Sequence, residues 1–397
     1  MKSSHHIAIL GGGLLGRLMA WRLSQQGLKI DLYEAGGKNS QASAAFAAAG
    51  MLAPITETER SDELIAHMGM AGLAAWPDLL SQLPAPVFMQ KKGTLIIWHQ
   101  QDQFIARRFH QHLQHHAPAE LLAKHLRHLT TSELLEIEPT LAINPTSSGK
   151  FTEALFLNNE GQLDNRQLLT ALDLALTQNN INCHYNTVVE QAPQDTSLTI
   201  DCRGMGAQML WASKQNQLHT DVMKKIPGPL RGVRGEVARV YAPDVTLQRP
   251  IRLMHPRYPI YIVPKENHVY VIGATEIDSD DASPVSVRSS LELLSAAMSI
   301  HPGFGEARIL ELNSQVRPTF ITPHPAIMLY NNQQKVSYPN IAINGLYRHG
   351  FLLAPAVTAL ATNLVLAILN DQCSHAESFN DWRDQASWPS ILYDNRY

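Results

Sequence analysis

Cysteine is scarce in this chain of 397 residues, and its three cysteines lie far apart at Cys183, Cys202 and Cys373. No two of them have the spacing of a metal site or a redox pair, so the sequence predicts no metal centre and a reducing compartment. The first residues contain no apolar run of the kind found in signal peptides, and an uninterrupted apolar run of about 18 residues is also missing, which predicts no membrane span. Together these absences predict a cytoplasmic protein.

An excess of positive charge is missing as well. The chain carries 32 lysines and arginines against 35 aspartates and glutamates, a formal net charge of −3. A nucleic-acid-binding protein would usually present a basic face, so we expect no nucleic-acid partner. The 18 histidines include a group in HQHLQHHAP (110–118), where we expect a solvated helix face because no carboxylate or cysteine of matching spacing accompanies it. With 45% hydrophobic residues, the composition is globular and the length allows two domains.

A nucleotide-binding pattern stands at the start of the sequence. Residues 6–16 read HIAILGGGLLG, a short apolar strand followed by the pattern G-x-G-x-x-G, and a helical period and a second strand ending in Glu34 come next. Gly11 permits a tight turn, Gly13 lets the backbone approach a pyrophosphate, and Gly16 lets the helix pack closely on the strand. Glu34 can accept hydrogen bonds from ribose hydroxyls. The unit therefore predicts a dinucleotide site, without distinguishing NAD from FAD.

A run of very small side chains follows this unit. Residues 42–50 read ASAAFAAAG, and Pro54 lies soon after them. Such a run can form a close-packed helix, or it can let the backbone lie against the flat ring of a ligand. The residues alone leave both interpretations open.

Three motifs in this order resemble the D-amino acid oxidase superfamily of flavoproteins: the dinucleotide unit, the segment AGML (49–52), and the segment GLYRHGFLLAP (345–355). Within the superfamily the sequence is most similar to the FAD-dependent glycine oxidase group of thiamine (thiazole) biosynthesis. The similarity extends from the first strand to about residue 370 and is weaker across 80–150. It implies FAD as the cofactor, bound non-covalently because no cysteine lies near Arg317.

The resemblance also implies the fold class. We expect an α/β protein with a Rossmann-like FAD-binding domain of the glutathione-reductase type and a second α+β domain built on an antiparallel sheet. The FAD-binding domain is expected at 1–80, 150–215 and 311–397, and the substrate-binding domain at 81–149 and 216–310. Helices are predicted at 60–80, 105–138, 159–176 (capped by Asp164) and 286–304, and strands at 93–98, 181–191, 231–243, 259–265 and 268–276. Residues 197–208 are predicted to form a strand that opens into a glycine loop, and 209–228 a loop.

The resemblance assigns cofactor contacts to residues of each motif. These are Gly11, Gly13, Leu14, Leu15, Gly16, Glu34, Ala35, Ala49, Gly50, Met51, Val188, Gly204, Leu346, Tyr347, Arg348, His349, Gly350, Phe351 and Leu352. A buried helix is predicted from Pro355 onward, with the proline in its first turn and its positive end toward the flavin, where negative charge develops on reduction.

Three side chains are candidates for the catalytic site. Arg317 matches the family's carboxylate-binding arginine, and a guanidinium can hold a carboxylate through two hydrogen bonds. Tyr261 matches the family's tyrosine, whose hydroxyl also reaches the carboxylate. The alternatives are an ion-paired or surface arginine and a core tyrosine. By the same resemblance, Arg348 faces the substrate or the flavin carbonyls.

Two features depart from the family pattern. His349 follows Arg348 where the family more often has asparagine or aspartate, and its role is unexplained. The residues before Tyr261 also differ, and they can either line the pocket entrance or belong to a plain loop: His255, Arg257 and Tyr258. These departures leave the choice of substrate open.

The resemblance implies FAD-dependent oxidative deamination of glycine or another small amino acid. Hydride passes from the substrate Cα to flavin N5, oxygen gives hydrogen peroxide, and the imine hydrolyses to glyoxylate or passes to thiazole synthase. A D-amino acid or N-methyl amino acid (sarcosine-like) dehydrogenase or oxidase is the alternative. The presence of both Arg317 and Tyr261 argues against an inactive flavin-binding module, and the acidic balance argues against tRNA modification. A homo-oligomer is also implied.

Overall fold

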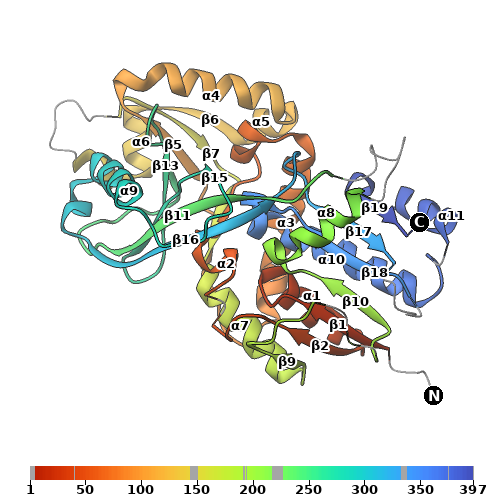
Figure 1. Ribbon diagram of the computed structural model, residues 1–397. Coiled ribbons are helices and arrows are strands. Elements are labelled where there is room, and N and C mark those ends of the chain that lie inside the picture. Colours follow the sequence, from red (N-terminus) through yellow and green to blue (C-terminus); the bar gives the residue numbers. More distant parts are fainter. Residues whose placement is uncertain are drawn as a thin grey trace.

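Two large β-sheets, each packed with helices, form most of the protein in the computed structural model (Figure 1). A third, small sheet has the order β3 (Met51–Leu52), β8 (Gly161–Leu163) and β4 (Met89–Gln90). The structure describes residues 5–39, 41–143, 151–190, 193, 195–216, 227–331, 338–373 and 375–396. One large sheet is mostly parallel and contains the strands of the nucleotide-binding pattern, and the other large sheet is mostly antiparallel. The predicted α/β fold class is confirmed.

The first sheet has the strand order β19-β17-β18-β10-β1-β2-β9. Its strands are β1 (His6–Leu10), β2 (Lys29–Tyr33), β9 (Asn182–His184), β10 (Leu198–Asp201), β17 (Ala326–Tyr330), β18 (Asn340–Asn344) and β19 (Leu392–Asn395). From β18 to β9 all neighbours are parallel, with Ile9 opposite Ile200 and Ile200 opposite Ile341. Because parallel strands end at the same edge, the turns after β1, β10 and β18 meet there.

Five of the described helices share one apolar core with this sheet. They are α1 (Leu14–Ser24), α3 (Glu63–Ser81), α7 (Asn165–Gln178), α10 (Gly350–Leu369) and α11 (Ala376–Asp384). Helix α7 begins after the predicted cap, Asp164, whose carboxylate accepts hydrogen bonds from the N–H groups of Arg166 and Gln167 at 2.8 and 3.0 Å. The cap supplies acceptors for N–H groups that the first turn of a helix leaves without partners.

Helix α10 differs from its prediction, because it begins at Gly350 and Pro355 lies inside it. A proline has no N–H, so the carbonyl of Phe351 loses its helical donor. The indole N–H of Trp76 in α3 donates to that carbonyl at 2.9 Å, which lets the helix continue through the proline. By length and composition the stretch Tyr347–Leu369 could cross a membrane, which the sequence did not predict; 78% of its most apolar 18-residue segment is buried inside the protein.

The second sheet has the order β15-β11-β14-β13-β12-β5-β7-β6, and β16 also pairs with β11. Its strands are β5 (Thr94–Trp98), β6 (Leu126–Thr130), β7 (Glu153–Leu157), β11 (Arg231–Tyr241), β12 (Ile251–Met254), β13 (Ile260–Pro264), β14 (Val269–Gly273), β15 (Ile277–Asp278) and β16 (Arg308–Thr319). Alternate residues of β5 belong to different cores: Ile97 packs in the core that includes α9 (Val287–Ile300), and Ile96 packs with α4 (Gln103–His116). This alternation follows from the two-residue period of a strand.

The positions at which the chain passes from one sheet to the other differ from the predicted domain boundaries at 150 and 311. Strand β7 and the whole of β16 belong to the second sheet. Strand β16 pairs with β11 from Thr319 opposite Arg231 to Arg308 opposite Tyr241, so the chain leaves the second sheet only after residue 319. Pairing between distant segments decides this membership, and the local residue pattern does not show it.

Three smaller predictions also need correction. Strand β6, between α5 (Ala119–His125) and α6 (Thr131–Ile137), interrupts the region 105–138 that was expected to be helical. The strand predicted at 181–191 is limited to β9. Helix α8 (Gln208–Asn216) occupies the start of the expected loop 209–228, of which residues 217–226 lie outside the described part of the chain.

Candidate functional site

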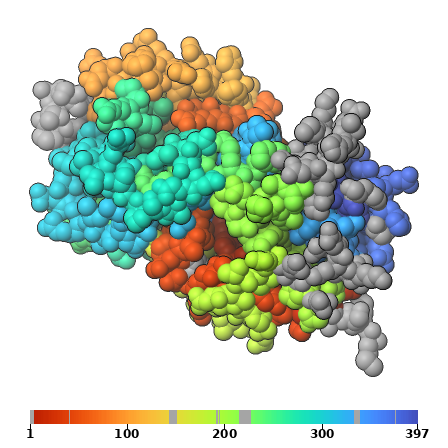
Figure 2. All heavy atoms as spheres, in the orientation of Figure 1, coloured from red at the N-terminus to blue at the C-terminus, as the bar shows by residue number. Residues whose placement is uncertain are grey.

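A cavity of about 1740 Å³ lies between the two sheets. The first sheet contributes the turns after β1, β10 and β18 to its wall, and the second contributes β11, β13 and the residues after β14. In the space-filling view the molecular surface is hollowed near its middle, with N-terminal atoms deep in the hollow (Figure 2). The cavity thus has an end at the edge of the parallel sheet, which we call the nucleotide end, and an end at the second sheet, which we call the substrate end.

Glycine turns form the nucleotide end. Gly11, with φ +95°, follows β1, and a side chain there would come within 2.7 Å of the Cys202 carbonyl after β10. Asn344, at the end of β18, donates through Nδ2 to the carbonyl of Gly204 at 2.9 Å. Three turns far apart in sequence therefore lie close together, and the absence of a side chain at Gly11 allows this close approach of backbone.

The start of α1 offers donors to this space. Its N-cap is Gly13, which has no side chain to cap the helix. A side chain at Gly16 would overlap the carbonyl oxygen of Gly11, so only glycine allows this close packing of helix and turn. Free N–H groups at a helix start bind phosphate oxygens. Glu34 lies after β2, and its carboxylate accepts hydrogen bonds from the N–H groups of Gly12 at 2.5 Å and Gly36 at 2.6 Å.

The small-residue segment forms the middle of the cavity. Both interpretations of it were partly right: α2 (Ala44–Ala47) is a helix of four residues, and the chain then extends along the cavity through Ala49 to Gly50. Gly50 has φ +69°, and a side chain there would overlap the carbonyl of Leu163. The Lys265 ammonium donates to the Ala49 and Leu163 carbonyls, each at 2.7 Å, and burial lowers its pKa to about 7. The segment is therefore fixed from behind by the second sheet.

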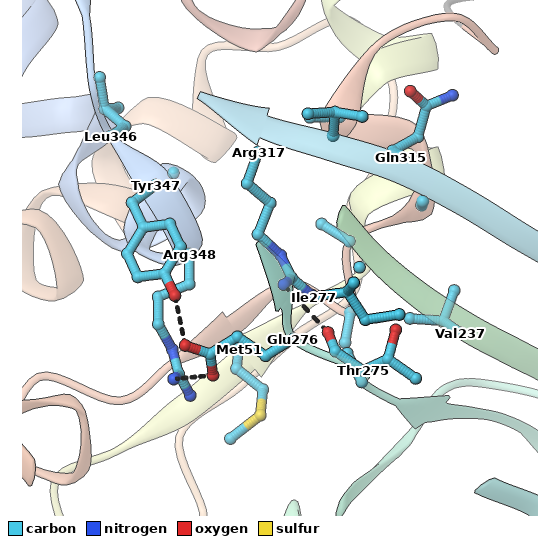
Figure 3. Close-up of a pocket in the computed structure, with 18 of the residues that line it drawn as sticks. Met51, Val237, Thr275, Glu276, Ile277, Gln315, Arg317, Leu346, Tyr347 and Arg348 are labelled. Atoms are coloured by element: carbon cyan, nitrogen blue, oxygen red, sulfur yellow. Dashed lines mark hydrogen bonds and ion pairs between the residues drawn. The ribbon is translucent and has the colours of Figure 1, made fainter. Parts of the chain in front are cut away.

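At the substrate end, two predicted side chains lie over glycines of the second sheet. A side chain at Gly273 would lie 2.7 Å from the hydroxyl of Tyr261. One at Gly235 would overlap the guanidinium of Arg317. Gly235 lies in the interior of β11 and Gly273 is the last residue of β14, and a glycine in a strand often marks the close approach of another group. The two glycines leave room for the phenol and the guanidinium, and both groups line the cavity. Figure 3 shows the Arg317 side chain extending toward Thr275.

Arg317 has little else to bind. Its Nη1 donates to the carbonyl of Thr275 at 3.2 Å, the interaction drawn in Figure 3. Among the residues that the structure describes, no carboxylate forms an ion pair with it, although it is only partly exposed. The alternative of an ion-paired arginine therefore has no support in the described chain, and the charge remains available to an anion in the cavity. Burial raises the pKa of Tyr261, against the opposing effect of the Arg317 and Arg348 charges, so this phenol stays protonated.

Arg348, the third candidate, is held by two carboxylates. Its Nε lies 2.6 Å from Glu57 Oε2 and its Nη1 lies 3.4 Å from Glu276 Oε2. Burial opposes the charge of Glu57, but Arg348, His349 and Arg252 outweigh it and lower its pKa. The same carboxylates outweigh burial for Arg348 and raise its pKa. Arg348 is therefore a neutralised part of the cavity wall.

His349 also has a partner in this cluster. It is only 2% exposed, and its Nδ1 lies 3.3 Å from Glu57 Oε2. This contact gives the residue that departs from the family pattern a structural role beside Arg348. The segment before Tyr261 also lines the cavity: His255 Nδ1 accepts hydrogen bonds from the N–H groups of Arg257 and Tyr258 at 3.1 and 2.9 Å.

Most of the predicted site residues line the cavity. Those that do are Gly11, Gly13, Leu14, Leu15, Glu34, Ala49, Gly50, Met51, Gly204, Tyr261, Arg317, Leu346, Tyr347, Arg348, Gly350 and Phe351. Those not among its lining residues are Gly16, Ala35, Val188, His349 and Leu352. Gly16 acts through close packing. The side chains of Ala35 and Val188 are exposed, Val188 by 75%, so side-chain contact with a buried ligand is not expected there.

Sequence reasoning missed four residues of the substrate end. Gly235 and Gly273 belong to the strand patterns RGVRGEV and VYVIG, and a glycine in a strand was a signal that could have identified them. Glu57 and Glu276 carried no such signal. Their importance comes from contact with Arg348, which lies far from both in the sequence.

Comparisons with known proteins agree with this geometry. The model of the FAD dependent oxidoreductase family (DAO) matches residues 6–364. A Rhizobium etli protein named as a thiamine biosynthesis oxidoreductase, ThiO, is 35% identical over 351 residues, which cover 88% of this chain and 93% of that protein. The bifunctional protein ThiO/ThiG of Trichormus variabilis is 24% identical, with 96% of this chain and 56% of that protein covered. The crystal structure of glycine oxidase from Geobacillus kaustophilus superposes with a TM-score of 0.72 at 24% sequence identity. The match covers 92% of this chain and 95% of the glycine oxidase chain.

Proposed function

Because the chain belongs to the family of FAD dependent oxidoreductases and is an FAD-dependent amino acid oxidoreductase, we propose that its substrate is glycine or a similarly small amino acid. The observation that supports this choice most directly is Arg317. Its guanidinium lies on a bare glycine, faces the cavity and has no acidic partner among the described residues. Such a group can bind one carboxylate through two parallel hydrogen bonds.

The residues of the nucleotide end fit FAD. The uncapped start of α1 can receive the pyrophosphate, the Glu34 carboxylate can accept ribose hydroxyls, and the segment from Ala44 to Gly50 leaves room for a flat ring. When bound, FAD supplies a flavin ring that accepts hydride from the substrate Cα and is reoxidised by oxygen with formation of hydrogen peroxide.

The protein's own residues orient the substrate. Arg317 would hold the carboxylate, and Tyr261, protonated and also facing the cavity, would donate a hydrogen bond to it from β13, in addition to the bonds from the guanidinium. Two strands separate β13 from β16, the strand of Arg317. A carboxylate fixed at two points leaves the Cα and amine directed away from the second sheet, toward the small-residue segment. Orientation of this kind can supply a large part of a rate enhancement.

The wider role is also proposed from the relatives. The names of two relatives include ThiO, and one joins ThiO to ThiG in a single protein. We therefore propose a role in thiamine thiazole biosynthesis, with the imine product either hydrolysed to glyoxylate or passed to thiazole synthase. A cytoplasmic location and a homo-oligomer remain proposals from the sequence.

Anaerobic mixing tests the proposal. The yellow absorbance of the purified holoenzyme should bleach with glycine, sarcosine or D-alanine, and admission of oxygen should restore it with one peroxide per amine consumed. No bleaching with any of the three would refute the proposed substrate class. Bleaching without peroxide would favour the dehydrogenase alternative.

A further inference from the structure

The arginines that line the cavity differ in their acidic partners. Those with a carboxylate partner are Arg60, Arg203, Arg252 and Arg348. Those that form no ion pair within the described chain but are largely exposed are Arg108, Arg257 and Arg288. Arg317 alone among the described lining arginines is both shielded from solvent and without an acid. The substrate end therefore has one cation that is not neutralised.

The neutralised arginines beside it form a balanced cluster. Three glutamates, Glu57, Glu59 and Glu276, lie among Arg60, Arg252 and Arg348, and all six line the cavity. Three carboxylates against three guanidiniums leave no net charge. A cluster of this kind offers little attraction to a further anion.

Glu276 lies between the two arginines of the substrate end (Figure 3). Its neighbour Thr275 accepts the hydrogen bond from Arg317, and its own Oε2 is 2.7 Å from Arg60 Nη1 and 3.4 Å from Arg348 Nη1. Its Oε1 accepts from the Tyr347 hydroxyl at 2.6 Å. Burial opposes its charge, but Arg348, Tyr347, Arg60 and Arg317 outweigh burial and lower its pKa, so it is ionised at neutral pH.

We propose that Glu276, together with Glu57, restricts the site to amino acids with a single carboxylate. This inference rests on the proposed function, in which Arg317 binds that carboxylate. A second carboxylate on the substrate, directed toward Arg348, meets a guanidinium that Glu57 and Glu276 already occupy, and it also meets the negative charge of Glu276 itself. Like charges at close range in a partly buried site are strongly unfavourable. Glu276 and Glu57 are thus specificity-determining residues.

The variant Glu276→Gln tests this directly, because glutamine keeps the size of the side chain and its acceptor for Tyr347 but removes the charge. D-Alanine and D-aspartate differ by one carboxylate. We expect the ratio of kcat/KM for D-aspartate to that for D-alanine to rise about tenfold or more in the variant. Glu57→Gln should shift the ratio in the same direction by releasing Arg348 from its other side. The matched control is Glu292→Gln, which removes one carboxylate from the cavity wall outside this cluster, and it should leave the ratio within about twofold.

A binding measurement provides a readout that does not depend on turnover. Acetate and malonate also differ by one carboxylate, and their dissociation constants can be measured by titration of the oxidised holoenzyme. Glu276→Gln should strengthen malonate binding relative to acetate by about tenfold, and Glu292→Gln should not. An unchanged malonate-to-acetate ratio in both Glu276→Gln and Glu57→Gln, or wild-type protein that turns over D-aspartate as well as D-alanine, would overturn the inference. Failure of the proposed function looks different, because the wild-type flavin would then bleach with no small amino acid.

Discussion

The two ends of the cavity are built in different ways. Backbone forms the nucleotide end: glycine turns, an uncapped helix and one carboxylate, with Gly11 and Glu34 only 23 residues apart in sequence. Side chains form the substrate end, and their partners come from far away, as with Arg348 and Glu57, which are separated by 291 positions. A site made of backbone depends on space, whereas a site made of side chains depends on which charges remain without partners.

The largest effect should follow from a loss of space at the nucleotide end. In Gly16→Val the new side chain would overlap the carbonyl oxygen of Gly11, so the turn and α1 would have to move apart. We expect protein purified without FAD and without yellow colour. The matched control is Gly305→Ala, because Gly305, like Gly16, has no positive φ, and the carbon added there would meet only the end of the Met298 side chain, at 3.6 Å. A Gly16→Val protein with full flavin content would show that close packing is not required here.

The same contrast explains what the sequence could predict. The nucleotide end is local, so strand, glycines, helix and Glu34 could be predicted from 29 consecutive residues. The membership of β7 and β16 in the second sheet could not be predicted in this way, because both strands join that sheet through pairing with distant partners. At the substrate end the sequence identified Arg317 and Tyr261 by resemblance, but the neutralisation of Arg348 depends on contacts between segments that no local pattern connects.

The next effect concerns the charge of Arg317. Replacement by alanine removes the cation without disturbing the nucleotide end, so we expect KM for glycine to rise about 100-fold with flavin content unchanged. Arg317→Lys should recover only part of this loss, because an ammonium cannot form two parallel hydrogen bonds. Steady-state kinetics with a flavin absorbance spectrum checks both. An unchanged KM in Arg317→Ala would remove this residue from the substrate end.

The titration of a buried acid behind the substrate end should make the free energy of unfolding depend on pH. Glu160 is fully buried, and it accepts hydrogen bonds from the N–H groups of Ile55 at 3.1 Å and Thr56 at 2.7 Å, where η1 (Thr56–Arg60) begins and carries Glu57 into the cavity. Burial raises its pKa from 4.5 to about 7. The folded state therefore holds the proton more tightly than the unfolded state, and this contribution to stability is present below about pH 4.5 and is lost as the pH rises toward 7.

Glu160→Gln removes that titration. Between pH 5 and 8 the free energy of unfolding of the wild type should fall relative to the variant by about 2 kcal/mol, measured by denaturant titration at each pH. Glu133→Gln is the control, because that carboxylate is on the surface and its pKa is lowered through hydrogen bonds from Thr130. Parallel stability curves for wild type and Glu160→Gln across this range would mean that Glu160 is ionised in the folded protein.

The smallest effect should come from a loss of space at the substrate end, where binding depends on charge. A methyl group at Gly235 would overlap the Arg317 guanidinium, but a long side chain can move where a backbone turn cannot. We therefore expect Gly235→Ala to retain FAD and to raise KM for glycine by only about three- to tenfold, with a smaller change in kcat, because the cation is displaced and not removed. The double variant with Arg317→Ala should show no further rise in KM, since the glycine acts only through the arginine above it. If the two effects on KM multiplied instead, Gly235 would have to contact the substrate itself, and the substrate end would depend on bare backbone in the same way as the nucleotide end.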